Sequence, residues 1–348
     1  MTQGFRWCPH CKGPHNLSDR TCTATGESLE AKMHRNGVGR VTSTLIGLLL
    51  DGKYRIDRLI GQGGMGQVFE AEDIARKRPV AVKVAATAEN SDARIRLERE
   101  AHLVRAIKHP NICDVLDVGR MPGGAPYVVF ERLFGQTLAE RVRGHRLPLR
   151  ATIHIFSQML SGLQAAHDAG IVHRDLKPEN VFIVDREGAE PLVKILDFGF
   201  ARDMSMAAAS RITRPGRVCG TMQYMSPEQL RVEATDQRSD LFSVGIILYE
   251  VLTGRHPFAA SSVVEIQMNI LRSSPPPLRD RRPDVPPQLE KVIGWALSRS
   301  PSDRPSSARE LQRTLLAVEE ASLPKLEDDD PVSVTEPVWR PRASSPSA

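Results

Sequence analysis

Short alternating runs of apolar and polar residues open the central part of this chain of 348 residues. The runs 54–60, 66–73 and 78–86 are typical of β-strands joined by tight connections, and a further strand is expected over 127–133. Between them, apolar residues over 91–107 recur near helical spacing. These helical positions are Ile95, Leu97, Leu103, Val104 and Ile107. The pattern predicts a small β-rich lobe with one helix.

Mostly helical spacing appears from about residue 151 onward, so a larger helical lobe is expected after the small one. The segment 241–253 is apolar nearly all round, which is typical of a helix buried at the centre of a lobe. The prolines over 273–287 predict a surface loop between helices. The predicted fold class is therefore α+β, with two lobes.

Both ends of the chain differ in composition from this central part. Residues 1–30 are rich in Cys and His and poor in large aliphatic residues, so they are interpreted as a small separate module. Residues 31–50 are interpreted as a linker that leads to one large domain over 51–320. The tail over 321–348 contains prolines and an acidic run without periodicity, so it is expected to be disordered.

Charge and hydropathy exclude several classes of protein. The net charge of +5 comes from 47 basic against 42 acidic residues spread along the whole chain, so no nucleic-acid partner is expected. The longest apolar runs, 45–50 and 241–253, are shorter than the roughly 20 residues of a membrane-spanning helix. Because the first residues also lack an apolar signal region, a cytoplasmic location is expected.

A glycine triplet with the spacing Gly61-x-Gly63-x-x-Gly66-x-Val68 lies between the first two predicted strands. Such a triplet also occurs in dinucleotide-binding folds, but there a helix follows, whereas a strand-like run follows here. A Walker loop would need Lys after the last glycine, and Gln67 stands in that place. The remaining interpretation is a glycine-tipped hairpin whose backbone N–H groups approach phosphate oxygens.

Lys83 alternates with valines on the third predicted strand, so its ammonium group is expected to face a specific partner. The following predicted helix carries two candidate counter-ions, Glu98 and Glu100. Glu100 is the favoured partner because its distance in sequence from residues 109–112 suits a helix that runs past the strand.

The stretch 171–184, IVHRDLKPENVFIV, places five ionisable side chains between two apolar runs. Together with GQGGMGQV, VAVK, DFG, SPE and DRP, in this order along the chain, it resembles the motif set of the eukaryotic-type protein Ser/Thr kinases, in particular their bacterial members. The resemblance covers about three quarters of the chain, from about 54 to 315. It implies a two-lobed protein kinase fold that binds ATP and Mg²⁺ and phosphorylates Ser or Thr hydroxyls of protein substrates.

The resemblance assigns roles to the charged residues of this stretch, which is expected to be a loop held at both ends by short strands. Asp175 would accept or orient the proton of the substrate hydroxyl, and Lys177 would stabilise the transferring phosphoryl group. Asn180 and Asp197 would hold Mg²⁺, since amide and carboxylate oxygens are the hard ligands that this ion prefers.

The nucleotide site follows by the same matching. Gly61, Gly63 and Gly66 would cover the phosphates, while Lys83, paired with Glu100, would contact the α- and β-phosphates. The adenine ring would lie between apolar side chains and against backbone groups at the junction of the lobes. The side chains are Val68, Ala81 and Phe182, and the backbone groups belong to Glu131 and Leu133. Phe130 would close the pocket behind the adenine.

Regulation by phosphorylation is also implied. Arg174 precedes the catalytic aspartate and is suited to bind a phosphate of the activation segment, here 197–228. Thr213 is the predicted autophosphorylation site, and Thr221 matches the threonine whose hydroxyl contacts the catalytic aspartate and lysine. For the oligomeric state, a dimer formed through the kinase domain is considered.

The resemblance also implies two contacts that stabilise the fold and take no part in the chemistry. Glu228 is expected to pair with Arg304 in a buried salt bridge. Asp240, at the start of the central apolar helix, is expected to accept hydrogen bonds from backbone N–H groups of the catalytic loop, which is the loop within 171–184. These bonds would hold the loop in place.

Cys8, Cys11 and Cys22 lie in the first 30 residues, where C-x₂-C is a common half of a zinc site. The segment resembles the short zinc ribbons that precede some bacterial kinase domains. Thr25 stands near the place of a fourth cysteine, so a histidine would have to complete the site. The candidates are His10, His15 and His34. The alternative is that this segment is a degenerate ribbon or carries free thiols.

Two other functions compete with an active kinase. A pseudokinase would lack one of the residues needed for phosphoryl transfer, but Lys83, Asp175, Asn180 and Asp197 are all present. An interaction scaffold built on the cysteine segment and the tail would make the kinase activity secondary.

Overall fold

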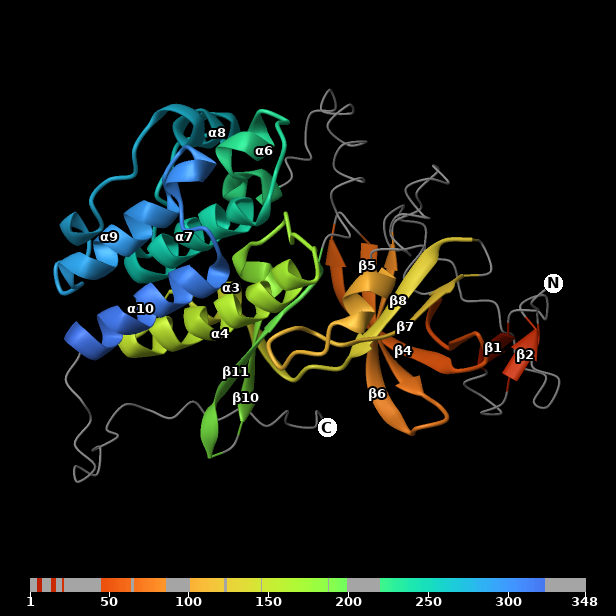
Figure 1. Cartoon of the computed structure of the whole chain (residues 1–348). Helices are drawn as coiled ribbons and strands as arrows, with labels where there is room; N and C mark the ends of the chain where they lie inside the picture. The colour runs from red at the N-terminus through yellow and green to blue at the C-terminus, as the bar shows by residue number, and fades with distance from the viewer. Residues whose placement is uncertain are drawn as a thin grey trace, which may run out of the picture.

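The computed structural model describes residues 5–7, 14–16, 21, 45–63, 66–85, 101–121, 124–144, 146–186, 188–198 and 220–322. A sheet-rich lobe and a helical lobe stand next to each other and are joined by the chain that leads out of strand β8 (Figure 1). The predicted α+β fold with two lobes is confirmed.

The small lobe is built on a sheet of eight described strands in the order β2-β1-β3-β4-β5-β6-β8-β7, with antiparallel neighbours. The strands are β1 (Phe5–Trp7), β2 (Pro14–Asn16), β3 (Leu48–Leu50), β4 (Tyr54–Gly63), β5 (Gly66–Asp73), β6 (Arg78–Ala85), β7 (Val115–Arg120) and β8 (Pro126–Glu131). The four strands predicted from alternation correspond to β4, β5, β6 and β8, whereas β7 was not predicted.

Alternation of side chains explains why these segments form strands. In β6, Val80, Val82 and Val84 are buried on one face of the sheet. They pack with Phe69 of β5 and Ile56 of β4 into the core of the small lobe. Ala81 and Lys83, at the intervening positions, point to the other face of the sheet and are half-buried, and Ala81 packs against the core shared with the large lobe.

The last residues of the predicted linker over 31–50 take part in the sheet of the small lobe. Residues 48–50 form β3, which pairs with β4, and Leu48 and Leu50 are buried in the core of the small lobe. Strand β1 in turn pairs with β3, with Phe5 opposite Leu49 and Arg6 opposite Leu48. The described strands of the predicted separate module therefore extend the sheet of the small lobe, while the domain boundaries themselves stay predictions.

The helix after β6 is described over residues 101–106. Its buried face consists of Ala101 and Val104, which belong to the core shared with the large lobe. Leu103, one of the apolar positions near helical spacing, does not belong to this buried face, because its side chain is 50% exposed. One position along a helix turns the side chain by about 100°, away from the face that Val104 presents.

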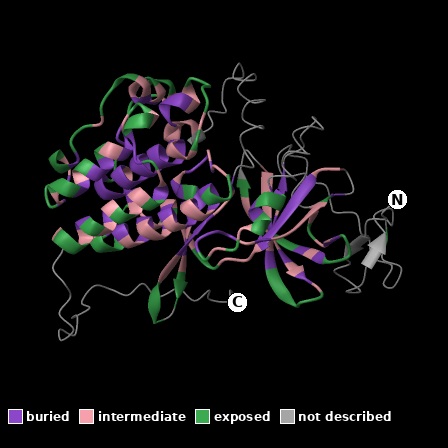
Figure 2. Ribbon diagram, in the orientation of Figure 1, coloured by how far each residue is buried: buried purple, intermediate pink, exposed green. Residues whose placement is uncertain are grey.

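The large lobe consists mainly of helices (Figure 1). They are α3 (Leu138–Arg141), α4 (Leu149–Asp168), α6 (Pro227–Leu230), α7 (Gln237–Thr253), α8 (Val263–Arg272), α9 (Pro287–Ala296) and α10 (Ala308–Ser322), with 3-10 turns η1 (Pro178–Asn180), η2 (Gly220–Tyr224), η3 (Leu278–Asp280) and η4 (Pro301–Asp303). Helix α7 is buried over almost all of its length (Figure 2), which confirms the predicted central helix. No helix within the described ranges carries an apolar stretch long enough to cross a lipid bilayer.

A three-stranded sheet lies where the lobes meet, with the order β11-β10-β9. Its strands are β9 (Gly135–Thr137), β10 (Val181–Arg186) and β11 (Ala189–Ile195). Strand β11 also touches the segment after the 101–106 helix, because Cys113 N donates to Ile195 O at 2.9 Å and Ile195 N donates to Asn111 O at 2.9 Å. This contact fixes the end of β11, and therefore the residues that follow it, against the small lobe.

The predicted surface loop over 273–287 is only partly at the surface. Leu278 and Val285 are buried in the core of the large lobe. Arg282 is also buried and donates from Nη1 to the carbonyl oxygens of Leu147 and Leu252, at 3.3 and 3.2 Å. Prolines prevent a regular helix here, but they do not prevent the apolar side chains between them from packing.

Candidate active site

The segment 171–177 has no regular secondary structure and follows the end of α4. The turn η1 and strand β10 come directly after it. The expectation of a strand at each end is therefore confirmed only at the second end. At the first end the apolar Ile171 and Val172 lead from the end of α4 into the loop, and Ile171 N donates to Ala166 O of that helix at 2.9 Å.

Asp240 anchors this loop from below, as predicted. Its carboxylate accepts a hydrogen bond from the backbone N–H of His173 at 2.8 Å and from that of Arg174 at 2.8 Å. His167 of α4 donates a third bond to it at 2.8 Å. Burial works to raise the pKa of Asp240, but the hydrogen bond from His167 and the nearby imidazoles hold this pKa below its ordinary value. The carboxylate is thus a fixed negative charge beneath the loop.

The structure brings Asp175, Lys177 and Asn180 together. Lys177 Nζ lies 3.3 Å from Asp175 Oδ2, and Asn180 Nδ2 donates to Asp175 O at 2.8 Å. Asp175 Oδ1 is buried and has no hydrogen-bond partner among the described residues. A buried carboxylate oxygen is expected to be satisfied, so this atom is available to a group that enters the site.

Asp197 and Lys83 meet from opposite lobes, with Lys83 Nζ 2.8 Å from Asp197 Oδ2. Asp197 has the rare positive φ of 56°, and Phe198 beside it is buried against the ring of His173, with the ring centroids 4.8 Å apart. The predicted partner of Lys83, Glu100, lies outside the described residues, so this pairing stays a prediction. The two motifs HRD and DFG are therefore in direct contact.

The glycine-tipped hairpin is formed by β4 and β5, with Gly63 opposite Gly66. Gly66 has a φ of 142°, and a Cβ at this position would collide with the carbonyl oxygen of Val84. Only glycine fits there without strain, because the backbones of β5 and β6 approach too closely. Gly61 and Val68 face each other across the same hairpin.

The residues predicted to surround adenine lie on strands that reach the junction of the lobes. Val68 pairs with Lys83, and Ala81 pairs with Phe130. Glu131 ends β8, Leu133 follows it, and Phe182 lies on β10. All three predicted apolar side chains are half-buried. Their role in binding a nucleotide stays a prediction.

The side chain of Glu131 was missed by sequence reasoning, which assigned only backbone groups to this residue. Glu131 Oε1 forms an ion pair with Lys194 Nζ at 2.6 Å and accepts from Asp114 N at 2.8 Å. Lys194 is buried on β11, three residues before Asp197. The available signal in the sequence was a lysine between the apolar residues Val193 and Ile195.

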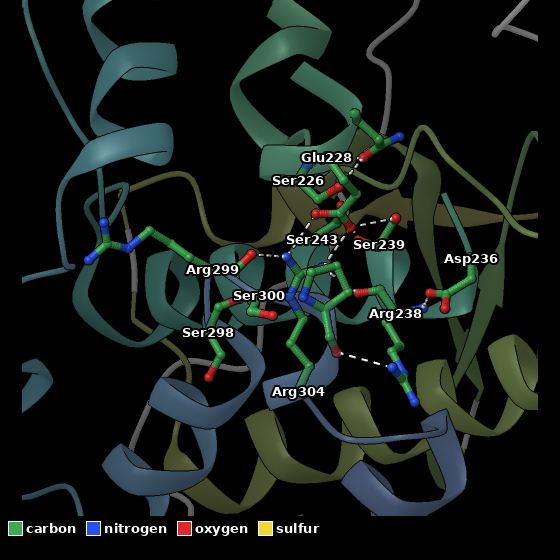
Figure 3. Close-up of polar contacts among 12 residues, drawn as sticks. Ser226, Glu228, Asp236, Arg238, Ser239, Ser243, Ser298, Arg299, Ser300 and Arg304 are labelled. Atoms are coloured by element: carbon green, nitrogen blue, oxygen red, sulfur yellow. Dashed lines mark hydrogen bonds and ion pairs between the residues drawn. The ribbon is translucent and has the colours of Figure 1, made fainter. Parts of the chain in front are cut away.

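Glu228 and Arg304 form the predicted buried salt bridge, and their side chains point toward each other (Figure 3). Arg304 donates from Nη1 and Nη2 to the two carboxylate oxygens at 2.7 and 2.8 Å. Burial alone would raise the pKa of Glu228, but the hydrogen bonds from Arg304 and Ser239 lower it to about 2. This bridge fixes helix α6 to the rest of the large lobe.

The predicted regulatory and zinc residues are described only in part. Thr213 lies outside the described residues, and Thr221 is described in its backbone only. Arg174 has a positive φ of 63°, and its buried Nε has no partner among the described residues. Cys8, Cys11 and Cys22 also lie outside the described ranges, and within those ranges no cluster of potential metal ligands was found.

Comparison with known proteins agrees with this geometry. The protein kinase domain family model matches residues 54–316. The chain is 42% identical over 285 residues to the Serine/threonine-protein kinase pkn3 of Myxococcus xanthus, covering 80% of this chain and 52% of the relative. It is 39% identical over 282 residues to the Serine/threonine-protein kinase PknB of Mycolicibacterium smegmatis, covering 79% of this chain and 44% of the relative. The chain thus spans about half the length of these curated relatives. It belongs to the protein kinase domain family, whose members use ATP and Mg²⁺.

Proposed function

We propose that this chain is a protein serine/threonine kinase that transfers the γ-phosphoryl group of ATP to Ser or Thr hydroxyls of proteins. The observation that carries the proposal is the meeting of Asp175, Lys177 and Asn180 in one loop beside the Lys83–Asp197 pair. Phosphoryl transfer requires mainly positioning and compensation of charge, and these five residues supply both.

Asp175 is the residue that would receive the substrate hydroxyl. Its buried Oδ1, which has no partner among the described residues, would accept the hydroxyl proton or orient it toward the phosphoryl group. Its other oxygen is held by Lys177 at 3.3 Å. The ammonium group of Lys177 would therefore lie close to the transferring phosphoryl group, where negative charge must be offset.

The donor set fits Mg²⁺. Asn180 uses its Nδ2 to bind Asp175, so its amide oxygen lies on the opposite side of the group and would be one ligand. The carboxylate of Asp197 would be the second. An ion held by these two residues would supply positive charge that offsets the charge of the ATP phosphates. Lys83 would contact the α- and β-phosphates, and the hairpin at Gly66 would cover them.

Autophosphorylation of Thr213 is proposed as the activating event. The support comes from Arg174, whose guanidinium carries a buried Nε without a partner among the described residues. A phosphate in the activation segment would supply the charged acceptors that this group lacks. The zinc site of the cysteine segment, a dimer through the kinase domain and a cytoplasmic location stay predictions.

The function is tested by incubating the full chain with labelled ATP, Mg²⁺ and a Ser/Thr-containing protein substrate. Wild type is expected to label the substrate and itself, at a turnover of roughly 1–100 s⁻¹ on a good substrate. The Asp175→Asn variant is expected to lose this labelling, and removal of Mg²⁺ by a chelator should abolish it. Labelling by Asp175→Asn at the wild-type rate would contradict the proposed mechanism, and a pseudokinase would show no labelling in any sample.

A further inference from the structure

The side-chain amide of Gln229 connects two segments that are far apart in the sequence. Gln229 lies on helix α6, and its Nε2 donates to the carbonyl oxygen of Arg174 in the catalytic loop at 2.8 Å. Its Oε1 accepts from the backbone N–H of Ser226 at 3.0 Å and from the hydroxyl of Ser226 at 3.2 Å. One amide group therefore closes the N-terminal cap of α6 and reaches the residue before Asp175.

The bond to Arg174 acts on a peptide unit that carries Asp175. The carbonyl of Arg174 and the N–H of Asp175 belong to the same rigid peptide plane. Gln229 donates a hydrogen bond to the carbonyl oxygen of this peptide, and the N–H group of Asp175 donates to His173 O at 2.9 Å. Fixing both sides sets the direction in which the Asp175 side chain leaves the backbone.

Arg174 needs such support because its φ of 63° lies in the left-handed region. A residue with a Cβ occupies this region only where the surrounding structure holds it. Asp240 holds the N–H of Arg174 at 2.8 Å, and Gln229 holds its carbonyl. Both backbone polar groups of the strained residue are therefore fixed by side chains from the large lobe.

The support is rigid because α6 is itself anchored. Glu228, the neighbour of Gln229, forms the buried bridge to Arg304 at 2.7 Å. Ser226, at the start of α6, lies within the last residues of the predicted activation segment 197–228. Gln229 thus joins the fixed end of that segment to the catalytic loop.

We propose that Gln229 is a positioning residue for Asp175 and couples the end of the activation segment to the catalytic loop. This inference rests on the catalytic role of Asp175 proposed above. The simpler alternative is that Gln229 only caps α6. The two functions use different atoms, since the cap needs the acceptor Oε1 and the coupling needs the donor Nε2.

Gln229→Glu separates these functions, because a carboxylate keeps an acceptor for Ser226 and loses the donor for Arg174. Gln312→Glu is the matched control, since Gln312 Nε2 also donates to a backbone carbonyl, that of Ser157, at 2.9 Å between α10 and α4. We expect Gln229→Glu to lower kcat about tenfold or more, with KM for ATP within about twofold of wild type. The control should keep the wild-type kcat with a similar change in melting temperature.

The pH dependence of Gln229→Glu gives a second readout that a capping role does not produce. A carboxyl group beside a carbonyl oxygen is more stable in its protonated form, which raises its pKa. The protonated group regains an O–H donor for Arg174. The activity of the variant relative to wild type should therefore increase as the pH is lowered from about 8 to about 6.

Gln229→Met, which keeps the length and removes both polar atoms, covers the case in which the charged variant does not fold. Either folded variant with kcat within about twofold of wild type would overturn the inference. A loss of kcat in Gln229→Glu that is matched by Gln312→Glu would overturn it as well. Asp175→Asn is assayed in parallel. If that variant stays active, the proposed catalytic role of Asp175 has failed. If it is inactive, the Gln229 variants test the positioning role by itself.

Discussion

Lys83 and Asp197 form an ion pair across the two lobes, with 2.8 Å between Nζ and Oδ2. Lys83 lies on β6 of the small lobe, and Asp197 follows β11 of the large lobe. Both side chains are largely buried, at 13% and 28% exposed, so the surrounding water screens their attraction less than at the surface. The pair places the residue expected to contact phosphates beside the residue expected to hold the metal.

Removing the ammonium group by Lys83→Met is expected to lower kcat/KM for ATP by roughly 100-fold, because a charge that offsets the phosphates is lost. Lys53→Met is the control, since Lys53 makes an ion pair of similar length with Asp117, at 3.1 Å, but is 57% exposed. Steady-state kinetics with varied ATP measures both. Equal effects of the two substitutions would contradict the role of Lys83.

Breaking the Glu228–Arg304 bridge by Arg304→Met is expected to lower the free energy of unfolding by about 3–5 kcal/mol, because Glu228 is left buried without its partner. Arg309→Met is the control, since Arg309 and Asp168 form an exposed pair at 3.3 Å, and such pairs contribute about 0–1 kcal/mol. Urea unfolding at pH 7.5 measures the difference. A loss in Arg304→Met no larger than in the control would show that the bridge does not stabilise the lobe.

His256 predicts a dependence of stability on pH. Burial lowers the pKa of His256 from 6.5 to about 4, although its hydrogen bond to the carbonyl of Gln223 opposes this shift. The unfolded chain therefore binds a proton first as the pH falls. The stabilisation is complete above pH 6.5 and is lost between pH 6.5 and pH 4, which amounts to about 2 kcal/mol at pH 5.

The variant His256→Asn removes this titration. The decrease in the free energy of unfolding between about pH 7.5 and about pH 5 should be smaller in the variant than in wild type by about 2 kcal/mol. Urea unfolding at both pH values measures it. An unchanged decrease would mean that other groups cause the loss of stability in acid. Glu228 does not interfere, because its pKa shift from 4.5 to about 2 acts below this range.

Autophosphorylation at Thr213 is expected to raise activity, because the phosphate would pair with the guanidinium group of Arg174. Tryptic mass spectrometry of active protein should find a phosphate on Thr213, and Thr213→Ala should keep a lower basal activity. Thr235→Ala, outside the segment 197–228, is the control. Full activity with Thr213 unmodified would exclude this route of activation.

The cysteine segment is expected to bind zinc through Cys8, Cys11 and Cys22. Elemental analysis of protein purified without added metal should give close to one zinc per chain, and Cys8→Ser should lose it. Cys113→Ser is the control, because Cys113 is a buried free cysteine of the kinase core. A content below about 0.2 zinc per chain in wild type would remove the zinc hypothesis.

The local pattern of apolar and polar residues was sufficient to predict those elements whose own sequence shows which face is buried. The valines of β6 alternate, so their face of the sheet was predictable, and the continuous apolar run of α7 predicted the central helix. The residues of the candidate site were predicted from the resemblance of their motifs to those of protein kinases. Asp175, Lys177 and Asn180 are close in the sequence, so a short loop brings them together in any fold that contains it.

Tertiary structure decided the contacts between distant segments. The pattern of residues 48–50 does not reveal a strand, because three residues form β3 only when β4 and β1 lie beside them. The ion pair of Glu131 with Lys194, and the bond from Gln229 to Arg174, join residues more than 50 positions apart. The sequence by itself indicated which side chains are expected to carry the chemistry, through motifs that resemble those of protein kinases. Their orientation was decided by packing, because a buried polar group takes whichever partner the fold brings within reach.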